Sequence, residues 1–263
     1  MSIIKNCKRI VVKIGTSTLT YESGALNIRR IEALARTLSD FKNAGHEIVM
    51  VSSGAVSAGF SRLALGEYPD TLQAKQACAA VGQIQLMKLY DSFFANYGHT
   101  VAQILMTKDV IDNPKRFNFA RGTFSELIKI GCIPIVNEND PVSIEELKFG
   151  GNDTLSAYVG IVCDADLLIN MSDIDGLYDK NPRKYPDAKL IDRVDDINDE
   201  ILSYAEGAGT KLGTGGMITK LKAAKIAADC GIPMLIINGE NPFRLYDILD
   251  GKHIGTYFAA KKG

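Results

Sequence analysis

The amino-acid sequence predicts an α/β fold, a three-layer α/β/α sandwich with a mostly parallel central sheet. Short apolar runs rich in β-branched residues, such as 47–51 and 133–136, alternate with longer segments of helical periodicity. Parallel neighbours are joined by crossovers of about a dozen residues or more, so this alternation indicates βαβ units with helices on both faces. No obvious linker divides the chain, and we expect one domain whose two lobes meet near Asp164.

In the first half of the chain, strands are expected at 9–13, 47–51, 100–106 and 133–136. The segment 27–43 places apolar residues at helical spacing, and Gly45 ends this helix. The segment 71–96 has a wide apolar face and forms one helix, or two joined near Gly82. A third helix, at 116–129, ends at Gly131.

In the second half, helices are expected at 155–163, 217–230 and 243–249, and strands at 167–170, 232–237 and 255–258. The helix at 217–230 should be amphipathic. Its apolar positions would be Ile218 and Leu221, and its polar positions Lys222 and Lys225.

Composition excludes several classes of protein. The chain has 263 residues, a net charge of −1 and 46% hydrophobic residues, which fits a sizeable core and no broad nucleic-acid or membrane partner. It has neither the apolar core of a signal peptide nor a run of about 18 apolar residues. Its scattered cysteines contain no C-x-x-C pair, so we expect no zinc site or disulfide framework and a cytoplasmic location: Cys7, Cys78, Cys132, Cys163 and Cys230.

Lys13 ends the first predicted strand and precedes a Gly-Thr-Ser turn at 15–17. A buried ammonium needs a partner anion or ligand, and open α/β sheets bind ligands where their strands end. Backbone N–H groups and hydroxyls of the turn would suit a phosphate. Equally, Lys13 could extend its ammonium to water.

The segment 213–220, Gly-Thr-Gly-Gly-Met-Ile-Thr-Lys, is the strongest local signal. Glycines at a helix N-terminus let N–H groups approach an anion, and Lys220 lies one turn further on. The alternative is a flexible loop before a surface helix. The segment is no Walker A motif, and the first strand lacks the G-x-G-x-x-G of a dinucleotide site.

Three further polar segments follow or precede predicted elements. In Asn-Glu-Asn-Asp at 137–140, Asp140 could hold an ammonium and the asparagine amides could donate to a carboxylate. A simple turn is the alternative, and the same choice applies to Gly-Gly-Asn-Asp at 150–153. The segment 52–55, Ser-Ser-Gly-Ala, is either an anion-binding helix N-terminus or an N-cap.

The histidines disfavour chemistry that needs an imidazole base. They precede strands and lie outside every glycine-rich turn: His46, His99 and His253. Phosphoryl transfer to a carboxylate needs no such base, because a carboxylate is already ionised at pH 7. In that reaction Lys13 and Lys220 could supply positive charge, and Asp153 could orient them.

Together these segments resemble the amino acid kinase family, and within it the enzymes that phosphorylate glutamate. The matching segments run in family order over nearly the whole chain: 12–17, 52–55, 137–140, 151–157, 172–178 and 213–220. The specific part is the pair Asn-Glu-Asn-Asp and Gly-Thr-Gly-Gly-Met, since the lysine turn marks only the wider family. Ser172 stands where a threonine is common.

The resemblance implies ATP-dependent phosphorylation of the γ-carboxylate of L-glutamate to L-glutamyl 5-phosphate, the first step of proline biosynthesis. Its implied catalytic residues are Lys13, Lys220 and Asp153. The residues implied to hold glutamate are Ser53, Gly54, Asn137, Asp140 and Asn152. The residues implied to bind the nucleotide are Lys13, Gly15, Ser172, Asp173, Thr214, Gly215, Gly216, Met217 and Lys220.

The resemblance carries further expectations. Mg²⁺ should accompany ATP, held mainly by phosphates and water, with no protein ligand that we can name. Residues from about 1 to 164 would form the amino-acid-binding lobe and those from about 165 to 263 the nucleotide-binding lobe, with no C-terminal PUA domain. Proline is expected as a feedback inhibitor, and a homo-oligomer, dimer or tetramer, could form through the 71–96 helix.

Two alternatives stay open. One is another kinase of the family, acting on acetylglutamate, aspartate, carbamate or a nucleotide. The segment 137–140 argues for a substrate with a free amino group, which acetylglutamate lacks. The other is a non-catalytic sensor of nucleotide and amino acid, against which the presence of Lys13, Asp153 and Lys220 argues.

Overall fold

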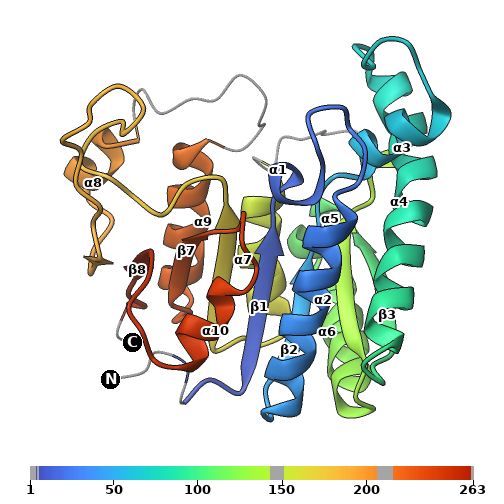
Figure 1. Ribbon diagram of the computed structural model, residues 1–263. Helices are drawn as coiled ribbons and strands as arrows, with labels where there is room; N and C mark the ends of the chain where they lie inside the picture. Colours follow the sequence, from blue (N-terminus) through green and yellow to red (C-terminus); the bar gives the residue numbers. More distant parts are fainter. Residues whose placement is uncertain (1–3, 5, 143–150, 206–215, 262–263) are drawn as a thin grey trace.

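The computed structural model describes residue 4 and residues 6–142, 151–205 and 216–261, and it confirms the predicted α/β/α sandwich (Figure 1). Within these ranges, one eight-stranded sheet has the order β3-β4-β2-β1-β5-β7-β8-β6 and is parallel except between β7 and β8. The strands are β1 (Arg9–Ile14), β2 (Glu47–Val51), β3 (Val101–Met106), β4 (Ile133–Glu138), β5 (Leu167–Ser172), β6 (Arg193–Val194), β7 (Met234–Asn238) and β8 (Thr256–Phe258).

Helices cover both faces of this sheet. One hydrophobic cluster packs α2 (Ile28–Asn43), α3 (Ala55–Leu63), α4 (Leu72–Ala95) and α10 (Arg244–Leu249) on one face. A second cluster packs α6 (Pro114–Lys129), α7 (Asn152–Val162) and α9 (Met217–Asp229) on the other. The remaining helical segments are short: α1 (Thr16–Leu19), α5 (Lys108–Asp112), η1 (Asp140–Val142) and α8 (Asp199–Ser203).

The strand β1 lies in the middle of the sheet and pairs in parallel with β2 on one side and β5 on the other. The chain therefore builds outward in both directions from β1, and open α/β sheets bind ligands beyond the carboxyl ends of the strands where the order reverses. Lys13 stands opposite Val51 of β2 and Asn170 of β5. Because side chains alternate along a strand, Lys13 shares its face with Val11, which packs in the cluster of α7 and α9.

Several elements are longer than the sequence predicts, and for two of them, β4 and α7, the difference matters for the site. The strand β4 continues through Glu138, and α7 begins at Asn152 rather than at residue 155. Asn137, Asn152 and Asp153 thus lie on regular elements, not in turns. Their polar side chains are satisfied by one another and by the neighbouring strand, so they need no turn to reach a partner.

The 71–96 segment forms one helix, α4, and Gly82 explains its wide apolar face. A Cβ atom at Gly82 would lie 1.8 Å from the Ala55 carbonyl oxygen of α3, and one at Gly59 would lie 1.8 Å from that of Cys78. The two backbones therefore touch, which only glycine permits at these positions. This close packing buries a second side of α4 besides the one that faces the sheet.

The expected face of α9 is wrong at one position. Ile218 is 46% exposed, whereas Lys220 is 4% exposed. Alanines, together with Leu221, form the face that packs on the sheet: Ala223, Ala224, Ala227 and Ala228. Small side chains bring α9 close to α7 and the sheet, and the long side chain of Lys220 reaches the carboxyl edge instead of solvent.

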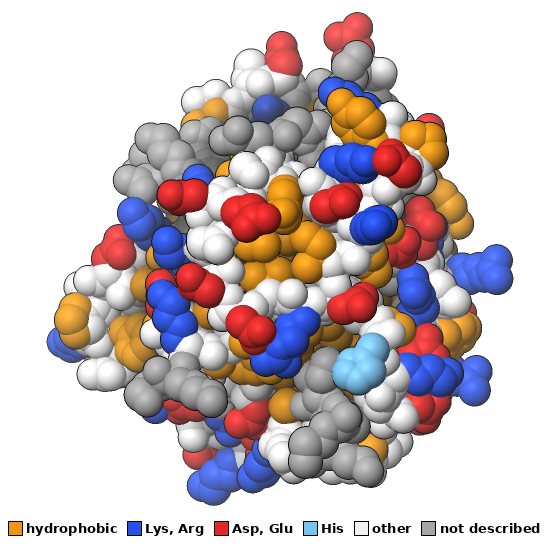
Figure 2. All heavy atoms as spheres, turned by 90° about the vertical axis from the view of Figure 1, so that its left-hand side faces the viewer, with side chains coloured by type: hydrophobic (Ala, Val, Ile, Leu, Met, Phe, Trp, Pro, Cys, Tyr) orange, Lys and Arg blue, Asp and Glu red, His pale blue; other side chains and the backbone are white. Residues whose placement is uncertain are grey.

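The surface seen in Figure 2 combines a central hydrophobic area with Lys, Arg, Asp and Glu side chains around it. Positive and negative groups are interspersed there, and neither sign dominates the view. Among the helices in the described ranges, none combines the length and the apolar character that crossing a membrane requires.

Candidate active site

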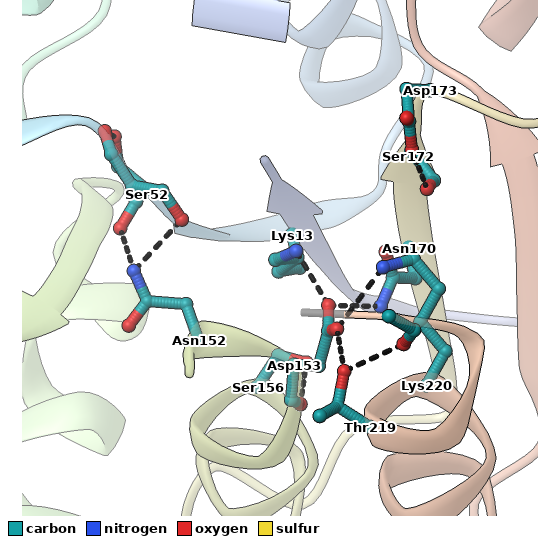
Figure 3. A network of polar contacts seen from close by, with 12 residues as sticks. Lys13, Ser52, Asn152, Asp153, Ser156, Asn170, Ser172, Asp173, Thr219 and Lys220 are labelled. Carbon is teal, nitrogen blue, oxygen red and sulfur yellow. Dashed lines mark hydrogen bonds and ion pairs between the residues drawn. The ribbon is translucent and has the colours of Figure 1, made fainter. Parts of the chain in front are cut away.

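Asp153 joins two lysines that are more than 200 residues apart in the sequence. Its Oδ1 lies 2.5 Å from the Lys13 Nζ, and its Oδ2 lies 3.1 Å from the Lys220 Nζ (Figure 3). Lys13 comes from β1, Asp153 from the first turn of α7, and Lys220 from the first turn of α9. The structure therefore brings together the residues that the sequence predicts to be catalytic.

Two neutral donors complete the surroundings of this carboxylate. The Asn170 amide nitrogen on β5 donates to Asp153 Oδ1 at 2.9 Å. The Thr219 hydroxyl lies 2.8 Å from Asp153 Oδ2 and 2.8 Å from the Gly216 carbonyl oxygen, and its one proton is shared between these two acceptors (Figure 3). Each carboxylate oxygen thus accepts one ammonium and one neutral donor. An ionised carboxylate offers about four lone-pair sites, so Asp153 is held in one orientation.

Burial makes this cluster electrostatically strong. Lys13 is 6% exposed and Asp153 1%. Burial by itself would raise the pKa of Asp153, but the ammonium groups of Lys13 and Lys220 hold it well below its usual range. Burial, and secondly the nearby Lys13 ammonium, lower the pKa of Lys220. Two ammonium groups and one carboxylate leave the cluster with net positive charge, which favours an incoming anion.

A second polar cluster adjoins the first at the ends of β2 and β4. The Asn152 amide nitrogen lies 2.8 Å from the Ser52 carbonyl oxygen, 2.9 Å from the Ser53 hydroxyl and 3.0 Å from Asn137 Oδ1. Asn137 in turn donates to Gln83 of α4 at 2.9 Å. These hydrogen bonds join the end of β2 to β4, α4 and α7, directly beside Asp153.

Asp140 follows β4 and begins η1. It is half-buried, and burial together with the nearby Glu138 carboxylate raises its pKa to about 7. This is the opposite of the shift at Asp153. A ligand that brings a positive charge to Asp140 would return it to its ionised form.

Gly54 forms the turn between β2 and α3. Its φ of 91° lies in the left-handed region that other residues rarely adopt, and its carbonyl accepts the first hydrogen bond of the helix. Ser52 and Ser53 follow the last residue of β2, Val51, and α3 begins directly after Gly54. The predicted acceptor-side residues Ser53, Gly54, Asn137 and Asn152 therefore lie together.

Most of the residues predicted to bind the nucleotide lie within the ranges that the structure describes. Ser172 ends β5 and donates to the Asp173 carboxylate at 3.1 Å, and Arg183 also contacts that carboxylate at 3.1 Å. Gly216 caps α9, followed by buried Met217. Gly15 follows β1, close to the Lys13 ammonium. Two predicted residues lie outside the described residues, Thr214 and Gly215.

Sequence reasoning did not single out several residues that complete these clusters: Gln83, Tyr90, Asn170 and Thr219. Tyr90 is fully buried and its hydroxyl lies 2.9 Å from the Ser52 hydroxyl. One signal was available for Asn170, because a polar residue interrupts the apolar run Leu-Leu-Ile-Asn-Met at 167–171. Nothing in the spacing of the α4 residues distinguishes Gln83 and Tyr90 from ordinary core positions.

Within the described ranges, no group of three or more His, Cys, Asp and Glu side chains is arranged to hold a metal ion. Mg²⁺ keeps several waters and is commonly bound through substrate phosphates and one or two carboxylates.

This is the fold of the amino acid kinases, and the chain belongs to the amino acid kinase family. The model of that family matches residues 8–238. Among its relatives, the glutamate 5-kinase of Clostridium perfringens is 54% identical over 264 residues, covering 99% of this chain and 98% of the relative. The glutamate 5-kinase of Carboxydothermus hydrogenoformans is 51% identical, covering 99% of this chain and 70% of the relative.

Similarity of structure extends further than similarity of sequence. The UMP kinase of Bacillus anthracis aligns with a TM-score of 0.65 at 15% identity, and the alignment covers 97% of each chain. At this identity the likeness supports the fold, and the substrate has to be argued from the site.

Proposed function

We propose that this chain is a glutamate 5-kinase, which transfers the γ-phosphoryl group of ATP to the γ-carboxylate of L-glutamate. The observation that carries the proposal is the bridge from Lys13 through Asp153 to Lys220 at the carboxyl edge of the sheet, in a chain that is about half identical in sequence to glutamate 5-kinases. The product would be L-glutamyl 5-phosphate, the first intermediate on the way to proline.

The lysine pair supplies the charge that phosphoryl transfer needs. A unit charge 4 Å away contributes about 4 kcal/mol at an effective dielectric constant near 20. Lys13 on β1 and Lys220 on α9 approach from different elements, so they can contact the transferred group from two sides. Asp153 keeps both ammonium groups in place before ATP arrives, and the attacking carboxylate needs no base.

The second cluster would hold glutamate. Asp140 would pair with the substrate ammonium, and the Ser53 hydroxyl and the amides of Asn137 and Asn152 would contact its carboxylates. Gly54 would form the backbone beside the bound substrate where α3 begins. A free amino group is what distinguishes glutamate from acetylglutamate, and the carboxylate of Asp140 is the group suited to recognise it.

The nucleotide would lie across the ends of β5 and α9. Gly15, Ser172 and Asp173 would line one side, and Gly216 and Met217 at the N-terminus of α9 would present N–H groups to the phosphates. When bound, Mg²⁺ would neutralise part of the phosphate charge, with water and phosphate oxygens as its principal ligands.

An acceptor panel tests the proposal. Release of ADP is measured with ATP and, in turn, L-glutamate, acetylglutamate, aspartate, carbamate and UMP. We expect turnover with glutamate far above the others. Turnover with acetylglutamate and not with glutamate would move the chain to another kinase of the family. Binding of ATP and glutamate without turnover would support a sensor instead.

Three accompanying properties belong to the same proposal. The enzyme would work in the cytoplasm, form a homo-oligomer through α4, and be inhibited by proline. Sedimentation of the protein, and the ADP assay repeated with added proline, test the last two. A monomer would contradict the proposed oligomer, and activity unchanged by proline would contradict the proposed inhibition. Neither result would contradict the assignment of the reaction.

A further inference from the structure

Asn170 is an unusual residue for its place in the sheet. It lies on β5 between apolar neighbours, is fully buried, and stands opposite Lys13 in the register of β1 and β5. Its Nδ2 donates to Asp153 Oδ1, while its Oδ1 has no hydrogen-bond partner among the described residues. The orientation is fixed, because a carboxylate accepts hydrogen bonds and only the amide nitrogen can donate one.

A buried amide with an unpaired oxygen lowers the free energy of unfolding compared with an apolar side chain at the same position. An unsatisfied buried acceptor loses its contacts with water and gains nothing in return, whereas an apolar side chain of similar size carries no such penalty. Leucine would suit this position, since Leu168 two residues earlier shares the same face of the strand. The presence of asparagine therefore calls for an explanation outside the packing of the core.

The arrangement of donors around Asp153 supplies one. Each carboxylate oxygen receives one ammonium, from Lys13 or Lys220, and one neutral donor, from Asn170 or Thr219. The ammonium groups are attracted to phosphate oxygens when a nucleotide binds, which loosens their hold on Asp153. The neutral donors have no such attraction, because their hydrogen bonds do not depend on the charge of the ligand.

We propose that Asn170 is a positioning residue for phosphoryl transfer, which keeps the Asp153 carboxylate oriented while Lys13 and Lys220 turn to the phosphates. This inference rests on the proposed kinase function. It goes further in assigning to a buried amide of β5 the task of maintaining the geometry of the lysine pair in the loaded enzyme.

The direct test compares Asn170→Leu with Ser156→Ala in the full-length chain. The Ser156 hydroxyl is also fully buried beside Asp153, but it donates to the backbone carbonyl of Asp153 and not to the carboxylate. We expect Asn170→Leu to keep or raise the melting temperature and to lower kcat about tenfold or more, with little change in the KM for glutamate. Ser156→Ala should lower the melting temperature and keep kcat within about twofold.

A double-mutant cycle with Asp153→Asn separates positioning from other effects on kcat. If Asn170 acts through the Asp153 carboxylate, Asn170→Leu should change kcat less than twofold once that carboxylate is gone. An equal loss of kcat in both backgrounds would overturn the positioning role. Asn170→Ala, which adds no volume, replaces the leucine variant if that one does not fold.

The outcomes distinguish the two proposals. An unmutated chain that does not phosphorylate glutamate contradicts the proposed function. An active unmutated chain whose Asn170→Leu and Asn170→Ala variants fold and keep kcat contradicts the positioning role alone.

Discussion

Two aspartates at the same edge of the sheet meet opposite electrostatic environments. Asp153 is almost fully buried between two ammonium groups, which hold its pKa well below the usual range despite the burial that would raise it. Asp140 is only half-buried, yet burial and the Glu138 carboxylate raise its pKa to about 7. At Asp153 the two ammonium groups outweigh the effect of burial on the pKa, whereas at Asp140 burial is the larger cause of the raised pKa and the Glu138 carboxylate adds to it.

This difference indicates which part of the site is prepared before substrates bind. The cluster of Asp153 is complete, with four donors on two oxygens, so its geometry is set by the protein alone. The pKa of Asp140 is about 7 in the free protein, and a cation beside it would favour the ionised form; the ammonium of glutamate is the cation we propose. The lysine and Asp153 groups on the phosphoryl side are therefore preorganised, which lowers the barrier to reaction. On the acceptor side, the bound substrate itself favours the ionised form of Asp140.

Replacing Lys220 with alanine should have the largest effect. Loss of one of two positive donors to the transferred group should lower kcat about 10²- to 10³-fold, by analogy with loss of an oxyanion donor. The ADP-release assay measures this loss, and circular dichroism checks that the variant is folded. Lys222→Ala, an exposed lysine on the same helix, is the matched control and should keep full activity. A fully active Lys220→Ala would show that the lysine pair is structural.

Asp153→Asn should combine a loss of activity with a loss of stability. Two buried ammonium groups lose their counter-ion, and breaking a buried pair costs about 3–5 kcal/mol. Urea unfolding measures the cost, and kcat should fall by about 10². ATP phosphates can replace the missing negative charge, so saturating ATP should raise the melting temperature more in this variant than in the unmutated chain. Equal shifts would contradict a phosphate site at the lysines.

The sequence predicts one half of the Asp153 cluster better than the other. Lys13 and the glycine-rich segment before Lys220 are visible because a lysine at the end of an apolar strand, and glycines at the start of a helix, each break a local pattern. Asn170 and Thr219 act through contacts made between strands and helices far apart in the chain. Their roles depend on the register of β5 with β1 and on the rotation of α9 about its axis.

The acceptor side shows a similar limit. The sequence shows that the polar segment 137–140 follows a strand, but it does not show that β4 continues through Glu138. Asparagine is disfavoured in strands, and here Asn137 is stabilised by an amide contact with Gln83 of α4. Periodicity also fails for α9, where the small size of its alanines, rather than the pattern of apolar residues, decides which face packs on the sheet.

Asp140→Asn tests the acceptor side without a large change of shape. The substrate ammonium would lose its charged partner, so the KM for glutamate should rise about tenfold or more while the KM for ATP stays the same. Steady-state kinetics with each substrate varied in turn measures both constants. Asp109→Asn, an exposed aspartate on α5, serves as control. A change confined to the KM for ATP would place Asp140 outside the acceptor site.

The pH dependence of glutamate binding should follow Asp140. Its pKa of about 7 in the free enzyme means that the carboxyl becomes protonated as the pH falls below neutrality, and the ionised form is the one that attracts the substrate ammonium. The KM for glutamate should therefore rise about tenfold from pH 8 to pH 6, and the KM for ATP should not follow it. In Asp140→Asn this rise should disappear, because no proton is left to take up at that position. A KM for glutamate that stays flat in the unmutated enzyme would show that Asp140 is already ionised before glutamate binds, and the contrast with Asp153 would then not hold.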